Sequence, residues 1–290
     1  MARAGFLYLV GTPIGNLKDV TRRALETLAA CDVIYCEDTR VSRKLLSHYG
    51  LHKPTSSFHG YSGEQVLNRV RRDLAAGKAV AYVTDAGMPG LADPGPELVR
   101  MCLEEGFAYD VIPGPSALAS ALSFLPVHAP RFTFLAFPGK KRGQLQQFAQ
   151  QLARCQHPAV VFVGPHHCAP LVQAACQALP PGTMVLLCRE LTKAHQEVKY
   201  LPLAELAVRT EEGIRGELTL IFVPPAPVAA ADDGILERTL SLQEVARKLL
   251  GLGLSARDAR RILEALFPGA KAAVRRAVYN KQSAGSGRAG

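Results

Sequence analysis

Short apolar runs alternate with amphipathic segments along the first half of the chain. Runs that are rich in Val, Ile, Leu, Tyr and Phe, and that have the length of buried strands, occupy residues 6–10, 33–36, 79–83, 109–112 and 132–135. Apolar residues recur at helical spacing over residues 21–30, 41–48, 64–76, 96–105 and 116–125. Strands that alternate with helices predict an α/β domain with a largely parallel sheet over residues 1–137.

The same alternation resumes after a segment that suits neither a helix nor a strand. Pro138, Gly139 and Gly143 surround three consecutive cations, and this composition predicts a hinge. A helical segment (144–154) and three apolar runs (159–163, 184–188 and 218–223) follow. A second α/β domain is therefore expected over residues 138–223.

The end of the chain has a different pattern. Residues 224–237 are rich in Pro and Ala and predict a stiff linker. Three short helical segments separated by Gly and Pro predict a small helix-turn-helix-like module over residues 238–281, and residues 282–290 are expected to be disordered. The apolar residues expected to face the inside of the module over residues 238–281 are Leu242, Val245, Leu249, Leu250, Ile262, Leu263, Leu266 and Val274.

Composition narrows the class of protein. The chain is 48% hydrophobic and 20% charged, which is ordinary for a globular protein. No window approaches the roughly 18 to 20 apolar residues of a membrane span, and the first apolar run turns at Gly11, so a cytoplasmic location is expected. The seven cysteines form no CxxC pair, which favours reduced core thiols over disulfides or zinc.

Positive charge is concentrated at the carboxyl terminus. The formal net charge is +9, and residues 238–290 carry 11 Lys and Arg against 3 Asp and Glu, whereas residues 1–237 carry 23 against 22. A basic module on a nearly neutral body indicates a polyanionic partner, such as a nucleic acid or a membrane surface.

Four successive strands of the first domain run into loops of the kind that bind ligands. These loops read GTPIGN (11–16), EDTR (37–40), TDAGMPGLADPG (84–95) and PGPSA (113–117). The carboxyl ends of parallel strands meet at one edge of a sheet, so the four loops are expected along one rim. The first loop matches neither GxGxxG nor the P-loop, which argues against NAD and ATP.

Two other candidate sites are weaker. Ser116 does not lie in a Gly-x-Ser-x-Gly elbow, so hydrolase chemistry is not expected. His166, His167 and Cys168 are adjacent and have no second pair of ligands, so no metal site is expected.

Taken together, the four loops resemble those of the tetrapyrrole methylase-like (class III) methyltransferases, which depend on S-adenosyl-L-methionine (SAM). Within that superfamily they are most similar to the enzymes that methylate the ribose 2′-hydroxyl of a cytidine in 16S ribosomal RNA, in the decoding region of the small subunit. The segments RELTK (189–193) and GELTL (216–220) support this narrower match. The resemblance covers about residues 6–280. Met88 and Ala92 depart from the family's loop pattern, and the family usually has Glu where His195 falls and an Arg near His167, so neither histidine is assigned a role.

The resemblance implies a fold of two α/β domains with the SAM cleft between them. It places Pro13, Asp85, Gly87, Met88, Ser116 and Ala117 at the cofactor from the first domain, and Phe162, Glu217 and Leu218 from the second. Ordinary core packing is the alternative for Phe162.

The implied reaction needs either a base for the ribose hydroxyl or strict alignment of oxygen, carbon and sulfur. The carboxylates in the matching segments are Glu37, Asp38 and Glu190, and the cations are Arg40 and Lys193. The cations could hold a phosphate, or Lys193 with a lowered pKa could be the base. The sequence leaves this choice open.

The implied partner is 16S rRNA, either free or in the 30S subunit, and the family resemblance also implies a homodimer. Six cations of the terminal module are candidates for contacts with RNA phosphates: Arg257, Arg260, Arg261, Lys271, Arg275 and Arg276. Two alternatives remain, a methylase of small molecules and an RNA-binding factor without catalytic activity on the same scaffold.

Overall fold

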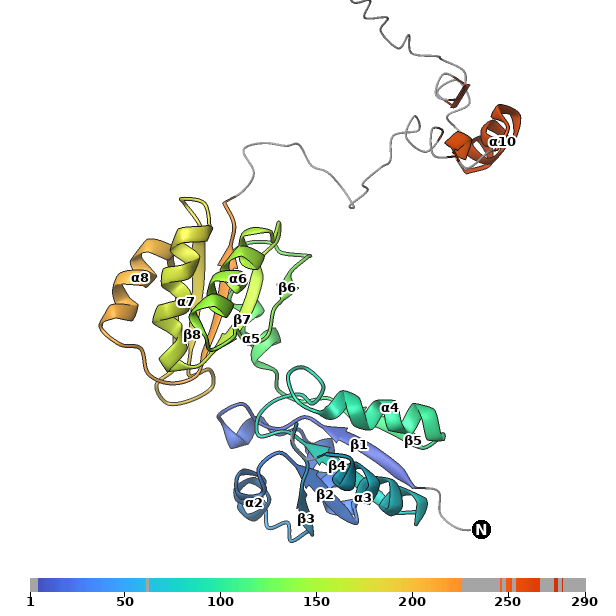
Figure 1. Cartoon of the computed structure of the whole chain (residues 1–290). Helices are drawn as coiled ribbons and strands as arrows, with labels where there is room; N and C mark the ends of the chain where they lie inside the picture. The colour runs from blue at the N-terminus through green and yellow to red at the C-terminus, as the bar shows by residue number, and fades with distance from the viewer. Residues whose placement is uncertain are drawn as a thin grey trace, which may run out of the picture. The chain divides into compact units, whose positions relative to one another are not determined.

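The structure, a computed structural model, describes residues 5–60, 63–225, 246, 249–251, 254–266, 274–275 and 278. The chain divides into two compact units, Met1–Pro225 and Ala226–Gly290, and each is described by itself (Figure 1). In the described part of the chain, every helix is too short or too polar to cross a bilayer.

Five parallel strands form the first sheet, in the order β3-β2-β4-β1-β5. The strands are β1 (Phe6–Val10), β2 (Val33–Cys36), β3 (Thr55–Ser57), β4 (Ala79–Val83) and β5 (Ala108–Ile112). The connecting helices are η1 (Leu17–Asp19), α1 (Arg22–Ala30), α2 (Thr39–His48), α3 (Gly63–Ala75) and α4 (Gly95–Glu105). Helices α3 and α4 pack on one face and α1 and α2 on the other, so every residue of β4 is buried.

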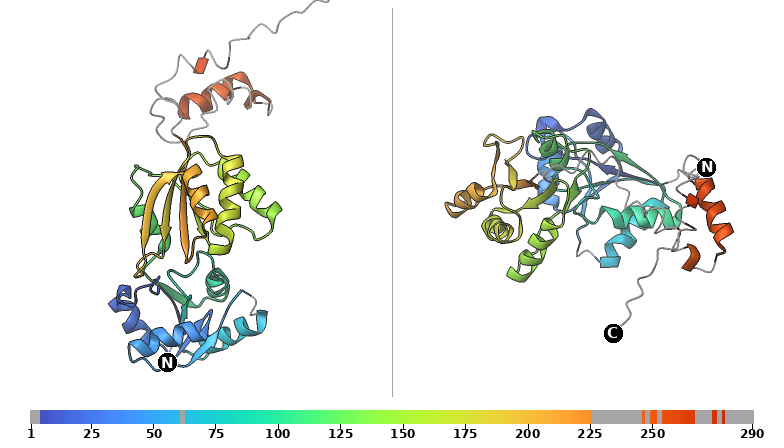
Figure 2. Two further views of the ribbon diagram at one scale, coloured as in Figure 1. Left: turned by 90° about the vertical axis from the view of Figure 1, so that its left-hand side faces the viewer. Right: turned by 90° about the horizontal axis from the view of Figure 1, so that it is seen from above.

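The second sheet is mixed, with the order β6-β7-β10-β8-β9. Its strands are β6 (Thr133–Phe134), β7 (Ala159–Val163), β8 (Met184–Arg189), β9 (Glu197–Pro202) and β10 (Leu218–Val223). Only β6 and β7 pair in parallel, and β10 runs antiparallel to both neighbours. The left view of Figure 2 shows this sheet in yellow and orange.

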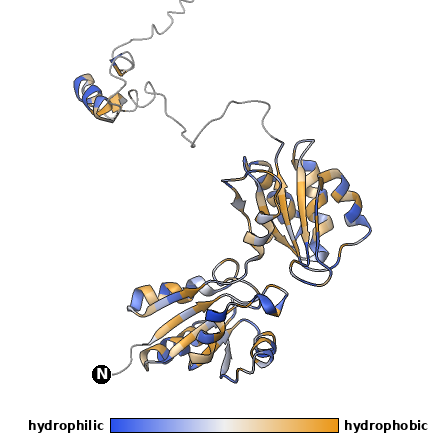
Figure 3. Cartoon of the chain, turned by 180° about the vertical axis from the view of Figure 1, so that it is seen from behind, coloured by the Kyte–Doolittle hydropathy of each residue, from blue (hydrophilic) through white to orange (hydrophobic). Residues whose placement is uncertain are grey.

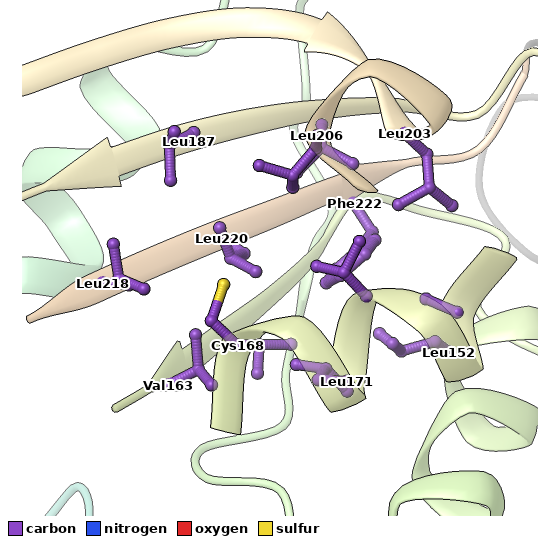
Figure 4. Close-up of a cluster of buried hydrophobic side chains, with 14 of the residues drawn as sticks. Leu152, Val163, Cys168, Leu171, Leu187, Leu203, Leu206, Leu218, Leu220 and Phe222 are labelled. Atoms are coloured by element: carbon purple, nitrogen blue, oxygen red, sulfur yellow. The ribbon is translucent and has the colours of Figure 1, made fainter. Parts of the chain in front are cut away.

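Helices cover both faces of the second sheet. Helices α6 (Arg142–Ala153), α7 (Pro165–Ala178) and α8 (Leu203–Glu211) bury a core that includes Leu152, Leu171, Leu206 and Phe222 (Figure 4). The other face packs against α5 (Ala117–Ser123), which follows the last strand of the first sheet. The strands of both sheets are mainly hydrophobic (Figure 3). One helix thus links the two sheets.

The structure confirms every predicted strand run, with ends shifted by one residue or none, but it adds elements that the pattern did not predict. Strand β3 is only three residues long, β9 carries Glu197, Lys199 and Tyr200, and α7 contains Pro170. The run 132–135 contributes β6 to the second sheet rather than to the first, because it pairs with β7. The domain boundary at residues 137 and 138 stays a prediction.

An ion-pair network joins β8, β9 and α8 through one carboxylate. Glu197 lies 2.7 Å from Arg209, 3.0 Å from Arg189 and 3.1 Å from Lys199. The hydrogen bond from Arg209 is the largest cause that lowers the pKa of Glu197, to about 2. This carboxylate is therefore ionised in the folded protein at any ordinary pH.

In the second unit, α10 (Ala256–Leu266) is the principal described element. The Ser255 hydroxyl accepts the Asp258 N–H, as expected for a helix start. Leu263 and Val274 are buried as predicted, but Leu250 and Ile262 are 37% and 38% exposed. Those two predictions were wrong because Ala246 and Val278 fill the inner positions. Leu242, Val245, the side chain of Leu266 and residues 226–237 and 282–290 lie outside the described part.

Candidate active site

Three loops at the carboxyl edge of the first sheet are held together by hydrogen bonds and close main-chain contacts. Thr12 and Gly87 exchange two hydrogen bonds, from Thr12 N–H to Gly87 O at 2.9 Å and from Gly87 N–H to Thr12 O at 3.1 Å. Gly11 and Gly114 approach so closely that a Cβ on Gly114 would lie 2.9 Å from Gly11 Cα. The sulfur of Met88 accepts the Gly114 N–H at 3.2 Å. The rim therefore has a fixed main-chain shape.

The loop after β4 is also braced from within. The carboxylate of Asp93 accepts the main-chain N–H groups of Gly90, Leu91 and Gly95, at 2.7, 3.2 and 2.8 Å. Gly87 has a φ of +84°, in the left-handed region that favours glycine. These contacts hold a long loop in one conformation.

Three acidic residues meet where β2 and β4 end side by side. Asp38 N–H donates to Asp85 Oδ1 at 3.0 Å, and Asp85 N–H donates to Glu37 Oε2 at 3.2 Å. Burial raises the pKa of Glu37, with a further contribution from the charge of Asp85. Burial likewise raises the pKa of Asp85. Both groups therefore hold a proton more readily than exposed carboxyls.

Asp38 has a different environment from its neighbours. Its carboxylate begins α2 by accepting the Arg40 N–H, and it pairs with the Arg40 guanidinium at 2.7 Å. The side-chain hydrogen bond from Arg40 is the main cause that lowers the pKa of Asp38 to about 2. This exposed pair lies beside the acidic cluster and stays charged.

On the second sheet, Glu190, Lys193 and Glu217 form a network at the ends of β8 and β10. Lys193 Nζ lies 2.9 Å from Glu190 Oε1 and 3.0 Å from Glu217 Oε2. Glu217 N–H donates to Glu190 Oε1 at 2.8 Å, and this hydrogen bond is the main cause that lowers the pKa of Glu190. One oxygen of the Glu190 carboxylate, Oε1, thus accepts hydrogen bonds from both Lys193 Nζ and Glu217 N–H.

The same turn contacts the first loop of the first sheet. Asn16 N–H donates to Thr192 Oγ1 at 3.0 Å, and a Cβ on Gly15 would lie 2.5 Å from Lys193 Cγ. Glu190 and Thr192 have φ angles of +49° and +67°, which is uncommon for residues other than glycine. A strained turn thus holds Lys193 against the loop after β1.

Both sheets line one cavity of about 310 Å³, which is within the size range of small-molecule sites. Eight of the nine predicted cofactor residues line it: Asp85, Gly87, Met88, Ser116, Ala117, Phe162, Glu217 and Leu218. Of the five predicted catalytic residues, only Glu37 lines it. Pro13, Asp38, Arg40, Glu190 and Lys193 are not among the lining residues, and the roles of all these residues stay predictions.

Sequence reasoning missed several residues of the cavity wall. Ile14, Leu91, Phe137, Cys188 and Leu191 also line it. The first two belong to recognised loops, so the loops themselves were the available signal. Leu191 belongs to the segment RELTK, which was the available signal for it. Cys188 belongs to a predicted core strand, and only its position at the end of that strand could have indicated it.

The surroundings of Lys193 do not favour the lowered pKa that a role as a base would need. Burial lowers the pKa of Lys193, but its hydrogen bonds to Glu190 and Glu217 outweigh burial and hold the pKa above its ordinary value. Lys193 is therefore a fixed cation.

In the second unit, the described candidates for RNA contact differ in whether an acidic side chain lies close to them. Arg257 and Arg261 are exposed on α10. Arg260 and Arg275 lie 3.8 and 4.0 Å from Glu264, which partly neutralises them. Lys271 and Arg276 lie outside the described residues.

No group of three or more His, Cys, Asp or Glu within the described residues could hold a metal ion. His166, His167 and Cys168 lie in the first turn of α7, where Cys168 is buried in the core.

Comparison with known proteins agrees with this architecture. A family model described as tetrapyrrole (corrin/porphyrin) methylases matches residues 6–207. A solved structure of uroporphyrin-III C-methyltransferase from Thermus thermophilus, complexed with S-adenyl homocysteine, superposes with a TM-score of 0.54 at 22% identity, over 75% of this chain and 97% of that chain. The expected fold is confirmed.

Two relatives narrow the match, and both are named ribosomal RNA small subunit methyltransferase I. The protein from Mesorhizobium japonicum is 37% identical over 236 residues, which cover 81% of this chain and 80% of the relative. The protein from Synechocystis sp. is 35% identical over 260 residues, which cover 89% of this chain and 92% of the relative. The chain therefore belongs to the tetrapyrrole methylase family and, within it, to the ribosomal RNA small subunit methyltransferase I group.

Proposed function

We propose that this protein transfers the methyl group of SAM to the ribose 2′-hydroxyl of a cytidine in 16S rRNA, in the decoding region of the small subunit. The observation that carries the proposal is the cavity lined by the rim loops of both sheets, with Glu37 in its wall. The names of the relatives support an RNA of the small ribosomal subunit as the substrate.

The residues present fit SAM. The cavity is lined mainly by apolar residues and glycine-rich main chain, with four acidic residues, Glu37, Asp85, Asp93 and Glu217, in its wall. SAM carries a sulfonium and an ammonium group, so carboxylates and main-chain acceptors suit it better than cations would. Gly87 has no side chain that could fill part of the cavity. A Cβ at this position would already lie 3.3 Å from Ile14. When bound, SAM supplies an electrophilic methyl group.

Among the candidate bases, Glu37 is the group best placed to take the proton of the ribose hydroxyl. It lines the cavity, and its raised pKa makes it a stronger base than an exposed carboxylate. Asp38 and Glu190 have lowered pKa values because their charges are already satisfied by neighbours. We assign Arg40 and Lys193 to phosphates next to the target ribose, since both remain cationic.

The terminal module supplies further RNA affinity in this proposal. Exposed Arg257 and Arg261 on α10 suit phosphate contacts, and the excess positive charge of residues 238–290 supports the same role. We propose the 30S subunit as the substrate particle and a homodimer as the working form.

The test is methyl transfer from labelled SAM to 30S subunits that lack the modification, followed by mapping of the labelled nucleotide. The expected product is a single 2′-O-methylcytidine in 16S rRNA. Label on another nucleotide or on a base would change the assigned substrate. No transfer to RNA, with SAM bound, would favour one of the other two functions.

A truncation tests the terminal module separately. Deletion of residues 235–290 is expected to weaken RNA binding while the affinity for S-adenosylhomocysteine (SAH) stays unchanged. Each phosphate that the truncated protein no longer binds should reduce the slope of log affinity against log salt by about 0.7 to 0.9. Equal slopes for the truncated and full-length proteins would remove the module from the RNA interface.

A further inference from the structure

Phe137 is an exposed aromatic residue in the wall of the cavity. Its side chain is 58% exposed although it lines the cavity, and the next residue, Pro138, is buried. An aromatic ring that is left in solvent at a binding site loses hydrophobic stabilisation unless a ligand covers it.

The ring of Phe137 is in contact with one other ring, which is itself supported by a second ring. Its centroid lies 5.6 Å from that of Phe162, and Phe162 in turn lies 5.0 Å from Phe134 in an edge-to-face arrangement. Phe162 N–H also donates to Ala136 O at 2.8 Å, which fixes the main chain just before Phe137. The exposed part of the ring thus belongs to a segment that these contacts hold in place.

Three cations begin three residues after Phe137 along the chain. Lys140, Lys141 and Arg142 are exposed, and within the described residues none of them forms an ion pair with an acidic side chain. Their charges are therefore available to a partner. A ligand that covers an aromatic ring and also places anionic groups nearby matches this surface.

We propose that Phe137 stacks on a nucleobase of single-stranded RNA at the cavity, while Lys140, Lys141 and Arg142 contact phosphates of the same strand. Single-stranded nucleic acids combine flat bases with a phosphate at each step, and proteins bind them with aromatic rings beside cations. SAM has an adenine ring but no phosphate, so it would leave the three cations without a partner. The inference deepens the proposed function and rests on it.

The absence of tryptophan from the sequence provides a direct test. Phe137→Trp introduces a single tryptophan at the proposed platform, whose emission can be excited apart from that of the tyrosines, and Phe132→Trp is the matched control. Phe132 is 44% exposed but is not among the residues that line the cavity. Hexacytidylate RNA is expected to quench the emission of Phe137→Trp and leave that of Phe132→Trp unchanged.

Steady-state kinetics with undermethylated 30S subunits give a second readout. Phe137→Ala is expected to raise KM for the subunits about tenfold, since one base stack contributes about that factor or more. Phe137→Tyr should restore KM, and Phe132→Ala should leave it unchanged. Affinity for SAH, measured by calorimetry, should be unchanged in all these variants.

A charge variant tests the phosphate contacts. Replacement of Lys140, Lys141 and Arg142 by Gln is expected to lower the salt slope of hexacytidylate binding by about 0.7 for each phosphate that is no longer neutralised. Arg154→Gln is the control, because Arg154 is exposed at the other end of α6. An unchanged slope would overturn the phosphate assignment.

The outcomes separate this inference from the proposed function. If Phe137→Ala weakens SAH binding as much as it raises KM, the ring stacks on the cofactor and the inference is overturned. If wild-type protein methylates the subunits while Phe137→Ala keeps its KM and RNA quenches neither Trp variant, the inference alone fails. If wild-type protein transfers no methyl group to RNA, both fail.

Discussion

Two acidic residues of the first sheet, Glu37 and Asp85, differ from two of the second sheet in what surrounds them. Glu37 and Asp85 accept main-chain N–H groups, form no ion pair with a Lys or Arg side chain among the described residues, and have raised pKa values. On the second sheet, Glu190 and Glu197 are paired with Lys or Arg side chains, and their pKa values are lowered. The first group has proton affinity and negative charge to offer a ligand, whereas the second group is already neutralised by the protein.

This difference separates carboxylates that can take part in catalysis from carboxylates that stabilise the fold. A carboxylate whose charge is paired with a cation of the protein stabilises the fold, and its removal should lower the stability. A carboxylate that lines a cavity and has no cation beside it can act in catalysis, and its removal should lower the rate of methyl transfer.

Glu37→Gln is expected to cause the largest change. The amide can still accept the Asp85 N–H, but it cannot take a proton from the ribose hydroxyl. The rate of methyl transfer should fall by roughly 10²- to 10⁴-fold, while SAH affinity stays within about twofold. In wild-type protein, activity should fall as pH decreases through the raised pKa of Glu37, and this limb should be absent from the residual activity of the variant.

Glu26→Gln is the control for that measurement. Glu26 pairs with Arg22 on the surface of α1, away from the cavity wall, so its rate and pH profile should match those of the wild type. A small effect of Glu37→Gln on rate would shift catalysis to alignment of the reactants alone.

Gly87→Val is expected to act on the cofactor through shape. Its Cβ would meet Ile14 at 3.3 Å, and the side chain would extend beside the cavity, so SAH affinity should fall by about tenfold to a hundredfold. Gly182→Val is a matched control, because Gly182 has nearly the same φ, +85°, and no atom within 4 Å of its Cβ. Both variants carry similar backbone strain, so an equal loss of SAH affinity would place the cofactor elsewhere.

Glu197→Gln is expected to lower stability and spare SAH binding. The unfolded chain protonates this residue near its ordinary pKa of 4.5, and the folded chain near 2, so the stabilisation is present above pH 4.5 and is lost between pH 4.5 and 2. Denaturant unfolding at pH 7 should show a loss of about 1–3 kcal/mol, and the difference from wild type should disappear near pH 2. Glu26→Gln, whose carboxylate side chain is 59% exposed, should change stability by less than about 0.5 kcal/mol.

Most long strands of the first sheet could be predicted from the sequence because they are apolar runs that end in distinctive loops, although β5, at the edge of the sheet, is exposed at four of its five residues. The polar strand β9 and the Pro-containing helix α7 could not, since their patterns depend on tertiary neighbours. The same limit applied to the site. Glycine-rich loops indicated the cavity, but no spacing revealed that Lys193 is held by Glu190 and Glu217, or that Phe137 stands in the wall.

The position of β10 has a consequence for how the protein is made. This strand is the centre of the second sheet, yet it is the last strand to be synthesised. At about 5–20 residues per second, the ribosome needs about 3–12 s to extend the chain from residue 163 to residue 223. During that interval β7, and β8 once residue 189 has been added, each lack the neighbour that β10 provides in the folded sheet. The speed of translation over this stretch therefore sets how long the nascent chain is open to strand-mediated aggregation.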